Sequence, residues 1–166
     1  MQTSVPGIYA IGDIVPTSAL AHTAYAEARL AVAHIAGKAA TPINYNAIPF
    51  CVYAKPESAG VGLNEKQARE KMGDDIIIGR FDMAANPKAA ILNERAGLIK
   101  VIADKNETLV GAHIAGPLAT EIIGEFALAV QNGLKLSDIL KTVHAHPSVY
   151  ESLHSAVHNA LKTKDS

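Results

Sequence analysis

The sequence is short of cysteine and of clustered positive charge. Its 166 residues contain one cysteine, Cys51, so a single chain can form no internal disulfide and cannot carry out dithiol chemistry. A lone thiol favours a reducing compartment. The net charge is −1, and the lysines and arginines are scattered along the chain. Because binding to phosphate backbones needs a basic surface, nucleic acid is not an expected partner.

Long hydrophobic runs are also missing. The most apolar stretch, residues 18–35, is interrupted by charged side chains such as Glu27 and Arg29. It is too short and too polar to cross a bilayer, which takes roughly 20 apolar residues. The first residues, from Met1 to Gly7, lack the basic and apolar regions of a secretory signal. We therefore expect a soluble, cytoplasmic protein without a membrane partner.

The chain does contain enough apolar material for one globular unit with a small appendage, since 49% of its residues are hydrophobic and 19% are charged. Residues 8–11 predict a short buried strand, and residues 18–36 predict a long helix that is apolar over much of its surface. A turn-rich segment, residues 37–46, predicts a linker. We therefore expect two domains, residues 1–46 and 47–166.

The second domain mixes strands with helices. Asn64 followed by Gln67 is typical of a helix that begins with a capping box. Because the strands are grouped before the helices, we expect an α+β fold with a mainly antiparallel sheet covered by helices on one face. The predicted strands are 48–53, 58–62, 75–81, 97–103 and 108–114. The predicted helices are 64–73, Pro117 to Asn132 with Ile122, Ile123, Phe126, Leu128, Ala129 and Val130 buried, Ser137 to Lys141, and Pro147 to Lys162.

The stretch H-A-H-P-S-V-Y-E, from His144 to Glu151, contains a candidate acid–base pair. A proline at the first helical position would hold His146 at the helix cap, outside the helix wall. Glu151, about one turn inside that helix, could fold back and accept the N–H of one imidazole nitrogen. The lone pair of the other nitrogen would then be available for general-base chemistry. The spacing alone favours a simpler alternative, a helix cap with a solvated glutamate.

Other patterns give no competing chemistry. Glu151, His154 and His158 share one helical face and could supply three zinc ligands. Cysteine partners and an H-E-x-x-H pair are missing, so no metal is expected. Residues 59–62, A-G-V-G, have only two of the three glycines of a dinucleotide fingerprint, and no serine lies in a G-x-S-x-G elbow.

A resemblance adds what spacing cannot supply. His144-Ala-His146-Pro147-Ser148-x-x-Glu151 resembles the H-x-H-P-T-x-x-E signature of the dihydrolipoamide dehydrogenases, a branch of the flavin-dependent pyridine nucleotide-disulfide oxidoreductases. Residues 111–117, G-A-H-I-A-G-P, with the helix that follows, are similar to part of the interface domain of that family. Residues 5–13, V-P-G-I-Y-A-I-G-D, are similar to the stretch that closes its flavin-binding domain. The resemblance covers nearly the whole chain.

The resemblance implies a fold and a set of site residues. Residues 1–46 would be the C-terminal remnant of the FAD-binding domain, and residues 47–166 would be the interface, or dimerisation, domain. His146 would be the base that removes a proton from dihydrolipoamide at the active site of the partner subunit, with Glu151 orienting its ring. In that family electrons pass through FAD to NAD. The implied flavin contacts are Asp13 to the ribityl chain, and Ala19, Leu20, Ala21 and His22 near the pyrimidine edge.

The resemblance also implies partners. The family forms homodimers, and its substrates are the lipoyl groups of 2-oxoacid dehydrogenase or glycine cleavage complexes. Glutathione reductase and its relatives share H-P-T-x-x-E, so an equivalent part of such a reductase is an alternative, although His144 favours the lipoamide branch. A second alternative is an association module in which His146 only caps a helix.

The sequence departs from the family pattern in several ways. It has neither the C-x-x-x-x-C redox pair nor the G-x-G-x-x-G fingerprints for FAD and NAD. We therefore expect the C-terminal part of a longer enzyme, which is inactive alone and binds neither cofactor stably. Ser148 replaces the usual threonine but keeps a hydroxyl, and Ala54-Lys55 replaces a more typical threonine and polar residue.

Overall fold

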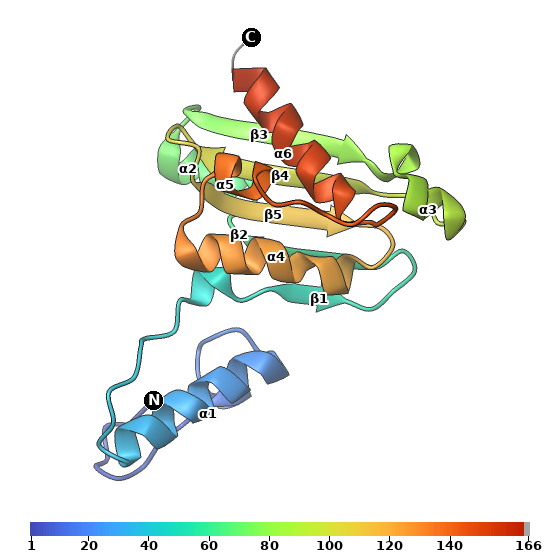
Figure 1. The fold of residues 1–166 in the computed structure, drawn as a ribbon. Helices are drawn as coiled ribbons and strands as arrows, with labels where there is room; N and C mark the ends of the chain where they lie inside the picture. The colour runs from blue at the N-terminus through green and yellow to red at the C-terminus, as the bar shows by residue number, and fades with distance from the viewer. Residues whose placement is uncertain (165–166) are drawn as a thin grey trace. The chain divides into compact units, whose positions relative to one another are not determined.

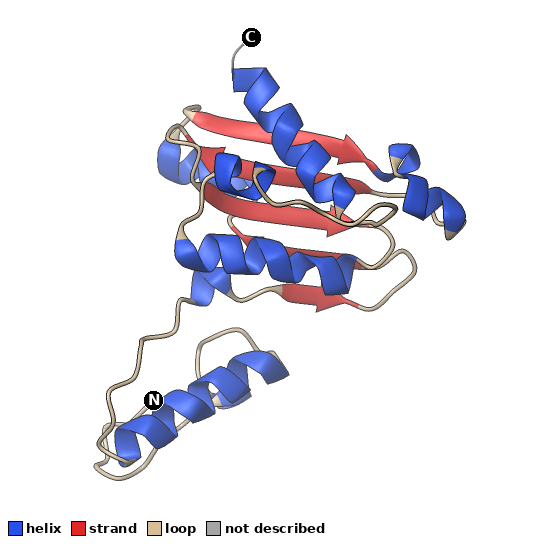
Figure 2. Cartoon of the chain, in the orientation of Figure 1, coloured by secondary structure: helices blue, strands red, loops and turns tan. Residues whose placement is uncertain are grey.

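The computed structural model describes residues 1–164, which form two compact units. The first unit is Met1–Ile48, and the second begins at Pro49. Figure 2 shows strands β1 to β5 in the second unit and a helical segment with loops in the first. Each unit is described by itself below.

The first unit is built around one helix, α1 (Ala21–Ile35), with the short 3₁₀ helices η1 (Gly12–Ile14) and η2 (Tyr45–Ala47). The predicted helix is therefore confirmed within a few residues at its start. Much of the apolar surface of this helix is exposed, for example at Tyr25 and Val32. The partners of α1 in this unit include η1, loops and Tyr45 of η2, and the buried residues of α1, Thr23, Glu27 and Ala31, form one narrow stripe of its surface.

The predicted strand at residues 8–11 is not formed. Tyr9 makes only an isolated antiparallel bridge to Gln2. A strand needs a neighbouring strand to satisfy its backbone N–H and C=O groups, and a two-stranded pairing this short is marginal in water.

The second unit is built on a sheet of five strands, β1 (Phe50–Val52), β2 (Ser58–Gly62), β3 (Ile76–Asp82), β4 (Leu98–Asp104) and β5 (Leu109–Ala115). Every neighbouring pair is antiparallel, in the order β1-β2-β5-β4-β3 (Figure 1). Asp104 closes the β4–β5 hairpin, because its Oδ1 accepts hydrogen bonds from the backbone N–H of Asn106 (2.9 Å) and Thr108 (2.8 Å). The predicted α+β class with an antiparallel sheet is confirmed.

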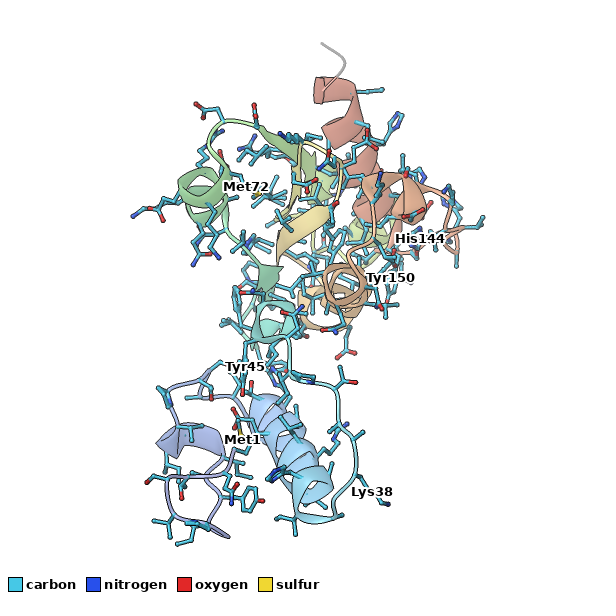
Figure 3. The ribbon with its side chains drawn as sticks, turned by 90° about the vertical axis from the view of Figure 1, so that its left-hand side faces the viewer. Met1, Lys38, Tyr45, Met72, His144 and Tyr150 are labelled. Carbon is cyan, nitrogen blue, oxygen red and sulfur yellow. The ribbon has the colours of Figure 1, made fainter. Side chains whose placement is uncertain are left out.

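The helices of this unit are α2 (Glu65–Met72), α3 (Pro87–Ile91), α4 (Ala119–Asn132), α5 (Leu136–Leu140) and α6 (Glu151–Lys164). The helix α4 packs on β2 and β5, and α6 packs on β3 and β4. Figure 3 shows α2, marked by Met72, on the opposite side of the sheet. Glu65 of α2 binds the side chains of Lys100 and Arg80 there, each at 3.0 Å. The second face is therefore partly covered as well, which the sequence pattern did not predict.

The core follows from strand alternation. Ile99 and Val101 of β4 point toward α4 and α6, and they pair with Ile114 and Ala112 of β5 on the same face. Full burial of an aliphatic or aromatic side chain of this kind contributes about 1.5–3 kcal/mol. The helical side of the core is formed by Ile122, Ile123, Phe126, Leu153, Ala156 and Val157.

Helix ends were predicted correctly where the signal is local. Asn64 and Gln67 form the expected capping box, with hydrogen bonds of 2.9 and 3.0 Å between each side chain and the other's backbone N–H. Gly73 follows α2, and Gly133 follows α4 with a left-handed φ of 60°. Glycine favours that conformation because it has no Cβ.

Three predicted helix starts are wrong. Pro117 is not the first helical residue, because Leu118 adopts a left-handed φ of 58° and α4 begins at Ala119. Ser137 lies inside α5, whose N-cap is Lys135. Pro147 does not open α6, which begins at Glu151.

One position of the predicted buried face of α4 is also wrong. Leu128 is 61% exposed, whereas Ile122, Ile123, Phe126 and Ala129 are buried as expected. Leu128 lies two positions after Phe126, which turns its side chain away from the stripe that faces the sheet.

A close approach of α6 to β3 gives a test of this packing. A Cβ at Gly79 would overlap the carbonyl oxygen of Ala156 and lie 2.7 Å from the backbone nitrogen of Ala160. We expect Gly79→Ala to lower the free energy of unfolding by about 1–3 kcal/mol, the usual cost of overpacking. The measurement is urea denaturation followed by circular dichroism.

The matched control is Gly124→Ala in α4, where a Cβ meets nothing within 4 Å. This change should raise stability by up to about 1 kcal/mol, because alanine has the higher helix propensity. A Gly79→Ala protein as stable as the unchanged chain would contradict the described contact.

Candidate active site

The histidine of the candidate acid–base pair, His146, lies on residues 141–150, a segment between α5 and α6 with no helix or strand, and Glu151 directly follows this segment. Val149 is buried and fixes the segment to the core. Buried Asn86 holds it from the other side, since its Nδ2 donates to the carbonyl oxygen of Ser148 (3.0 Å) and to Oγ of Ser152 (2.7 Å). Oδ1 of the same Asn86 accepts the backbone N–H of Ala89 (2.9 Å) at the start of α3. One buried amide therefore joins three parts of the unit.

His146 and Glu151 are in contact. Nδ1 of His146 lies 2.8 Å from Oε1 of Glu151, and Oε2 of Glu151 accepts the backbone N–H of Ser148 at 2.9 Å. An ionised carboxylate can only accept hydrogen bonds, so the hydrogen of this contact belongs to Nδ1. In the neutral ring the lone pair is then on Nε2. The His146 side chain is 71% exposed, so it is open to approach from outside the unit.

The charge on Glu151 is stabilised locally. The backbone N–H of Ser148 and the hydrogen bond from His146 together hold the pKa of the Glu151 carboxyl below its ordinary value, against a smaller opposing effect of burial. The carboxylate therefore stays ionised and keeps its orienting role to a lower pH than a solvated glutamate would.

The contact forms in a different way from the one predicted. His146 is not a helix cap, and Glu151 is the first residue of α6 and not one turn inside it. The peptide bond between His146 and Pro147 is cis. The segment itself folds back, so that Ser148 and His146 both reach the carboxylate at the helix start.

A second imidazole–carboxylate pair lies beside the first, and sequence reasoning missed its carboxylate. Nε2 of His144 is 2.9 Å from Oε2 and 3.1 Å from Oε1 of Glu125 in α4. The His144 side chain is 8% exposed. The two residues are far apart in the sequence, so no helical or turn spacing links them, and only the tertiary packing of α4 against the segment reveals the pair.

The residues implied for flavin lie in the first unit. Asp13 is exposed in η1, directly after Gly12, whose φ is 71°. Ala19, Ala21 and His22 are exposed and Leu20 is half-buried where α1 begins. The 3₁₀ helix η1 packs against α1, so both groups belong to one local framework.

That framework depends on Glu27, which sequence reasoning treated only as an interruption of an apolar run. Glu27 is fully buried, and its carboxylate accepts hydrogen bonds from the backbone N–H of Gly12 (2.7 Å), Oγ1 of Thr17 (2.8 Å) and the hydroxyl of Tyr45 (3.0 Å). Burial raises the pKa of the Glu27 carboxyl, but these hydrogen bonds outweigh it and the net pKa is lowered. The backbone next to Asp13 is thereby fixed to α1.

Other candidate chemistry has no structural support. Among residues 1–164, no group of three or more His, Cys, Asp or Glu side chains is placed to hold a metal ion, which includes the face of Glu151, His154 and His158. Cys51 is half-buried, and burial raises the pKa of its thiol. Over the same described range, no helix has the length and apolar character that spanning a bilayer requires.

Comparison with protein families gives a match over residues 48–157. These residues match the model of the family described as "Pyridine nucleotide-disulphide oxidoreductase, dimerisation domain". The match begins close to the boundary between the two compact units and covers most of the second.

Curated relatives and solved structures agree with this match. The chain is 44% identical over 163 residues to the dihydrolipoyl dehydrogenase of Geobacillus stearothermophilus, covering 98% of the chain and 34% of that protein. It is 41% identical over 156 residues to the mitochondrial dihydrolipoyl dehydrogenase of Canis lupus familiaris, covering 93% of the chain and 30% of that protein. The chain thus spans about a third of the length of these relatives.

Among solved structures, LpdA of Mycobacterium tuberculosis superposes with a TM-score of 0.88 at 26% identity, covering 95% of this chain and 34% of that one. A Cu(II) complex of the HOCl-induced flavoprotein disulfide reductase RclA of Escherichia coli gives a TM-score of 0.87 at 26% identity, covering 95% and 36%. The fold is therefore that of the matching third of these two structures.

The contacts of Glu151 predict a pH-dependent contribution to stability. The pKa of the Glu151 carboxyl is lowered in the folded state. Its contribution to the free energy of unfolding is therefore fully present above pH 4.5 and is lost as the pH falls through the folded-state pKa. We expect Glu151→Gln to lower the free energy of unfolding by about 1 kcal/mol at neutral pH, since one of two hydrogen bonds to the carboxylate is lost. The measurement is urea denaturation at a series of pH values.

The difference between the two proteins should narrow as the pH falls below 4.5. Glu121→Gln, which changes an exposed glutamate on α4, is the matched control and should show no comparable effect. A Glu151→Gln difference that stays constant over this range would contradict the lowered pKa.

Proposed function

Because the chain belongs to the pyridine nucleotide-disulphide oxidoreductases through their dimerisation domain, we propose that it supplies the acid–base pair and dimer surface of a dihydrolipoyl dehydrogenase. Such an enzyme oxidises dihydrolipoamide to lipoamide and reduces NAD to NADH. The resemblance noted in the sequence is confirmed at the level of the family. The activity is our inference, supported by relatives of that name that are 41–45% identical to the chain.

The observation that carries the proposal is the hydrogen bond between Nδ1 of His146 and Glu151. It leaves the basic lone pair on Nε2 of a ring that is 71% exposed. A thiol with a pKa of about 8.5 is mostly protonated at neutral pH and is a poor nucleophile in that form. Nε2 of His146 would take the proton from one thiol of dihydrolipoamide, and the thiolate would then attack a disulfide sulfur and displace a thiolate. The imidazolium would be stabilised by the Glu151 carboxylate.

The redox centre itself needs residues that this sequence does not contain. With one cysteine, Cys51, and no C-x-x-x-x-C pair, the chain would act as the C-terminal part of a longer enzyme and would not turn over alone. FAD, when bound in such an enzyme and contacted by Asp13 and residues 19–22, would supply the electron transfer between the disulfide centre and NAD. The chain's own part is to present His146 to that centre in the partner subunit.

The exposed groups of the first unit fit one wall of a flavin site. The Asp13 carboxylate is an acceptor suited to the ribityl hydroxyl groups, and its backbone is fixed through the Gly12–Glu27 hydrogen bond. Ala19 to His22 would lie along the pyrimidine edge of the flavin. We accordingly assign residues 1–46 to the end of a FAD-binding domain, which by itself would hold neither FAD nor NAD stably.

The proposed enzyme is a homodimer in the cytoplasm that acts on lipoyl groups of 2-oxoacid dehydrogenase or glycine cleavage complexes. The outer surface of α4 and the segment at 141–150 carry large exposed apolar side chains, Leu118, Leu128 and Val143. A two-fold interface is self-complementary, so one such surface on each copy is sufficient. An association module without catalysis uses the same surface and differs from the proposal only in the role of His146.

Replacement of His146 distinguishes the catalytic function from an association module without catalysis. In the assembled flavoenzyme, His146→Gln should lower the rate of dihydrolipoamide oxidation by roughly 10²–10⁴-fold, the usual contribution of a positioned general base. The measurements are NADH formation, FAD absorbance and sedimentation, and the last two should stay unchanged. His158→Gln, the same substitution at an exposed position of α6, is the control. Normal turnover of the His146→Gln enzyme would reject catalysis and leave the association module.

The dimer surface has its own test. Leu128→Glu places a charge on the exposed side of α4 and should shift sedimentation equilibrium of the chain toward monomer. Ile91→Glu on α3, another exposed apolar position, is the control and should leave association unchanged. Equal association of both variants and the unchanged chain would place the interface elsewhere.

A further inference from the structure

The buried pair formed by His144 and Glu125 differs from the proposed catalytic pair in its surroundings. The His144 side chain is 8% exposed and the Glu125 side chain 21%, whereas His146 is 71% exposed. Both carboxylate oxygens of Glu125 face Nε2 of His144, at 2.9 and 3.1 Å. Because the ring is buried and the carboxylate is half-buried, solvent screens this contact less than it screens the exposed pair.

The exposed pair cannot by itself fix the geometry of its own segment. Ion pairs open to solvent contribute little, because water screens them and two side chains must be ordered to form them. Residues 141–150 have no helix or strand, so their position depends on side-chain contacts with the rest of the unit. In the half of the segment before Pro147, His144 makes such a contact, and it reaches α4.

The ring of His144 also touches the other half of the segment. It stacks on Tyr150, with ring centroids 5.9 Å apart and planes 10° apart, and it meets the edge of His154 at 6.4 Å. Tyr150 directly precedes Glu151, and His154 lies one turn further along α6. Figure 3 shows His144 and Tyr150 close together on the side of the sheet that carries α4. The stacking thus links His144, two positions before His146, to Tyr150, which directly precedes Glu151.

Charge adds to this link. The titratable groups that face His144 are Glu125 from α4, Tyr150 from the segment, and His154 and Glu151 from α6. A positive charge on His144 is among the influences that lower the pKa of the Glu151 carboxyl, after the hydrogen bonds from Ser148 and His146. A change at Glu125 therefore reaches Glu151 both through the position of the segment and through charge.

The other ring nitrogen has no compensating partner. Within the described residues, Nδ1 of His144 is buried and makes no hydrogen bond. Loss of the Glu125 carboxylate would leave both nitrogens of a buried ring unpaired, which strongly favours movement of the ring toward water. Such a movement would break the stacking on Tyr150 and release the segment that carries His146.

We propose that His144 and Glu125 are positioning residues, which hold the His146–Glu151 pair in its geometry by tying both halves of residues 141–150 to α4. This inference rests on the proposed function for its effect on turnover. Its effect on the geometry of the pair is independent of turnover. The two effects are therefore measured separately.

The first measurement uses the chain itself. The pKa of the Glu151 carboxyl is followed by ¹³C NMR in Glu125→Ala and in Glu121→Ala, a matched change four residues earlier on the exposed side of α4. We expect the Glu151 pKa to rise in Glu125→Ala, because the donors Ser148 and His146 lie on the released segment. It should stay unchanged in Glu121→Ala.

The second measurement uses the assembled flavoenzyme. Glu125→Ala should lower kcat for dihydrolipoamide oxidation by about 10- to 100-fold with little change in KM, since a base displaced by about 1 Å costs up to 10²-fold. The variant His144→Gln keeps an N–H donor for Glu125, and Glu125→Gln keeps an acceptor for His144. Each of these single variants should retain most of the rate of the unchanged enzyme. These conservative variants also carry the test if Glu125→Ala does not fold.

The outcomes distinguish the positioning role of His144 and Glu125 from the proposed function. A lower melting temperature in Glu125→Ala with an unchanged Glu151 pKa and an unchanged kcat would show a structural role only and overturn this inference. A raised Glu151 pKa together with full activity of His146→Gln would support the positioning role while rejecting the proposed function. A raised pKa with reduced kcat, absent in Glu121→Ala, supports both.

Discussion

The hydrogen bond from Nδ1 of His146 to Glu151 is the interaction on which the functional account depends. Glu151 uses its two oxygens for different purposes, since one accepts the backbone N–H of Ser148 and the other accepts the imidazole. The first contact fixes the carboxylate to the backbone, and the second fixes the ring to the carboxylate. The tautomer follows from this arrangement, because Nδ1 carries the hydrogen that it donates to the carboxylate, and the basic lone pair is then on Nε2. A base with a defined tautomer and an open nitrogen is the result.

The rest of the second unit provides the rigid support for that bond. The antiparallel sheet binds α6 closely, because Gly79 of β3 has no side chain between the backbones. Glu151 is the first residue of α6, so the packing of that helix sets the place of the carboxylate. From the other side, α4 reaches the segment before the helix through Glu125 and His144. The helix α6 thus sets the position of Glu151, and α4, through Glu125 and His144, sets the position of the segment that carries His146.

The sequence predicts most of this fold but only part of the site. The sequence predicts the capping box at Asn64 and the five strands of the sheet because each of these signals lies within a few residues. Pro147 misled the prediction of the last helix, since a proline signal is local and the fold of residues 141–150 is set by tertiary contacts. The start of α4 was missed because Leu118 takes a left-handed conformation that branched and aliphatic side chains rarely adopt. Glu125 was missed because its partner is distant in sequence.

The central claim is that Glu151 holds the ring of His146 in the tautomer with a hydrogen on Nδ1. The most direct test is ¹⁵N NMR of the His146 ring in the chain, at a pH where the ring is neutral, with and without Glu151→Gln. The account predicts a protonated Nδ1 and a bare Nε2 in the unchanged chain, with a shift toward the common Nε2–H tautomer in the variant. A His146 ring that carries its hydrogen on Nε2 in the unchanged chain would contradict the account, because no basic nitrogen would then face outward.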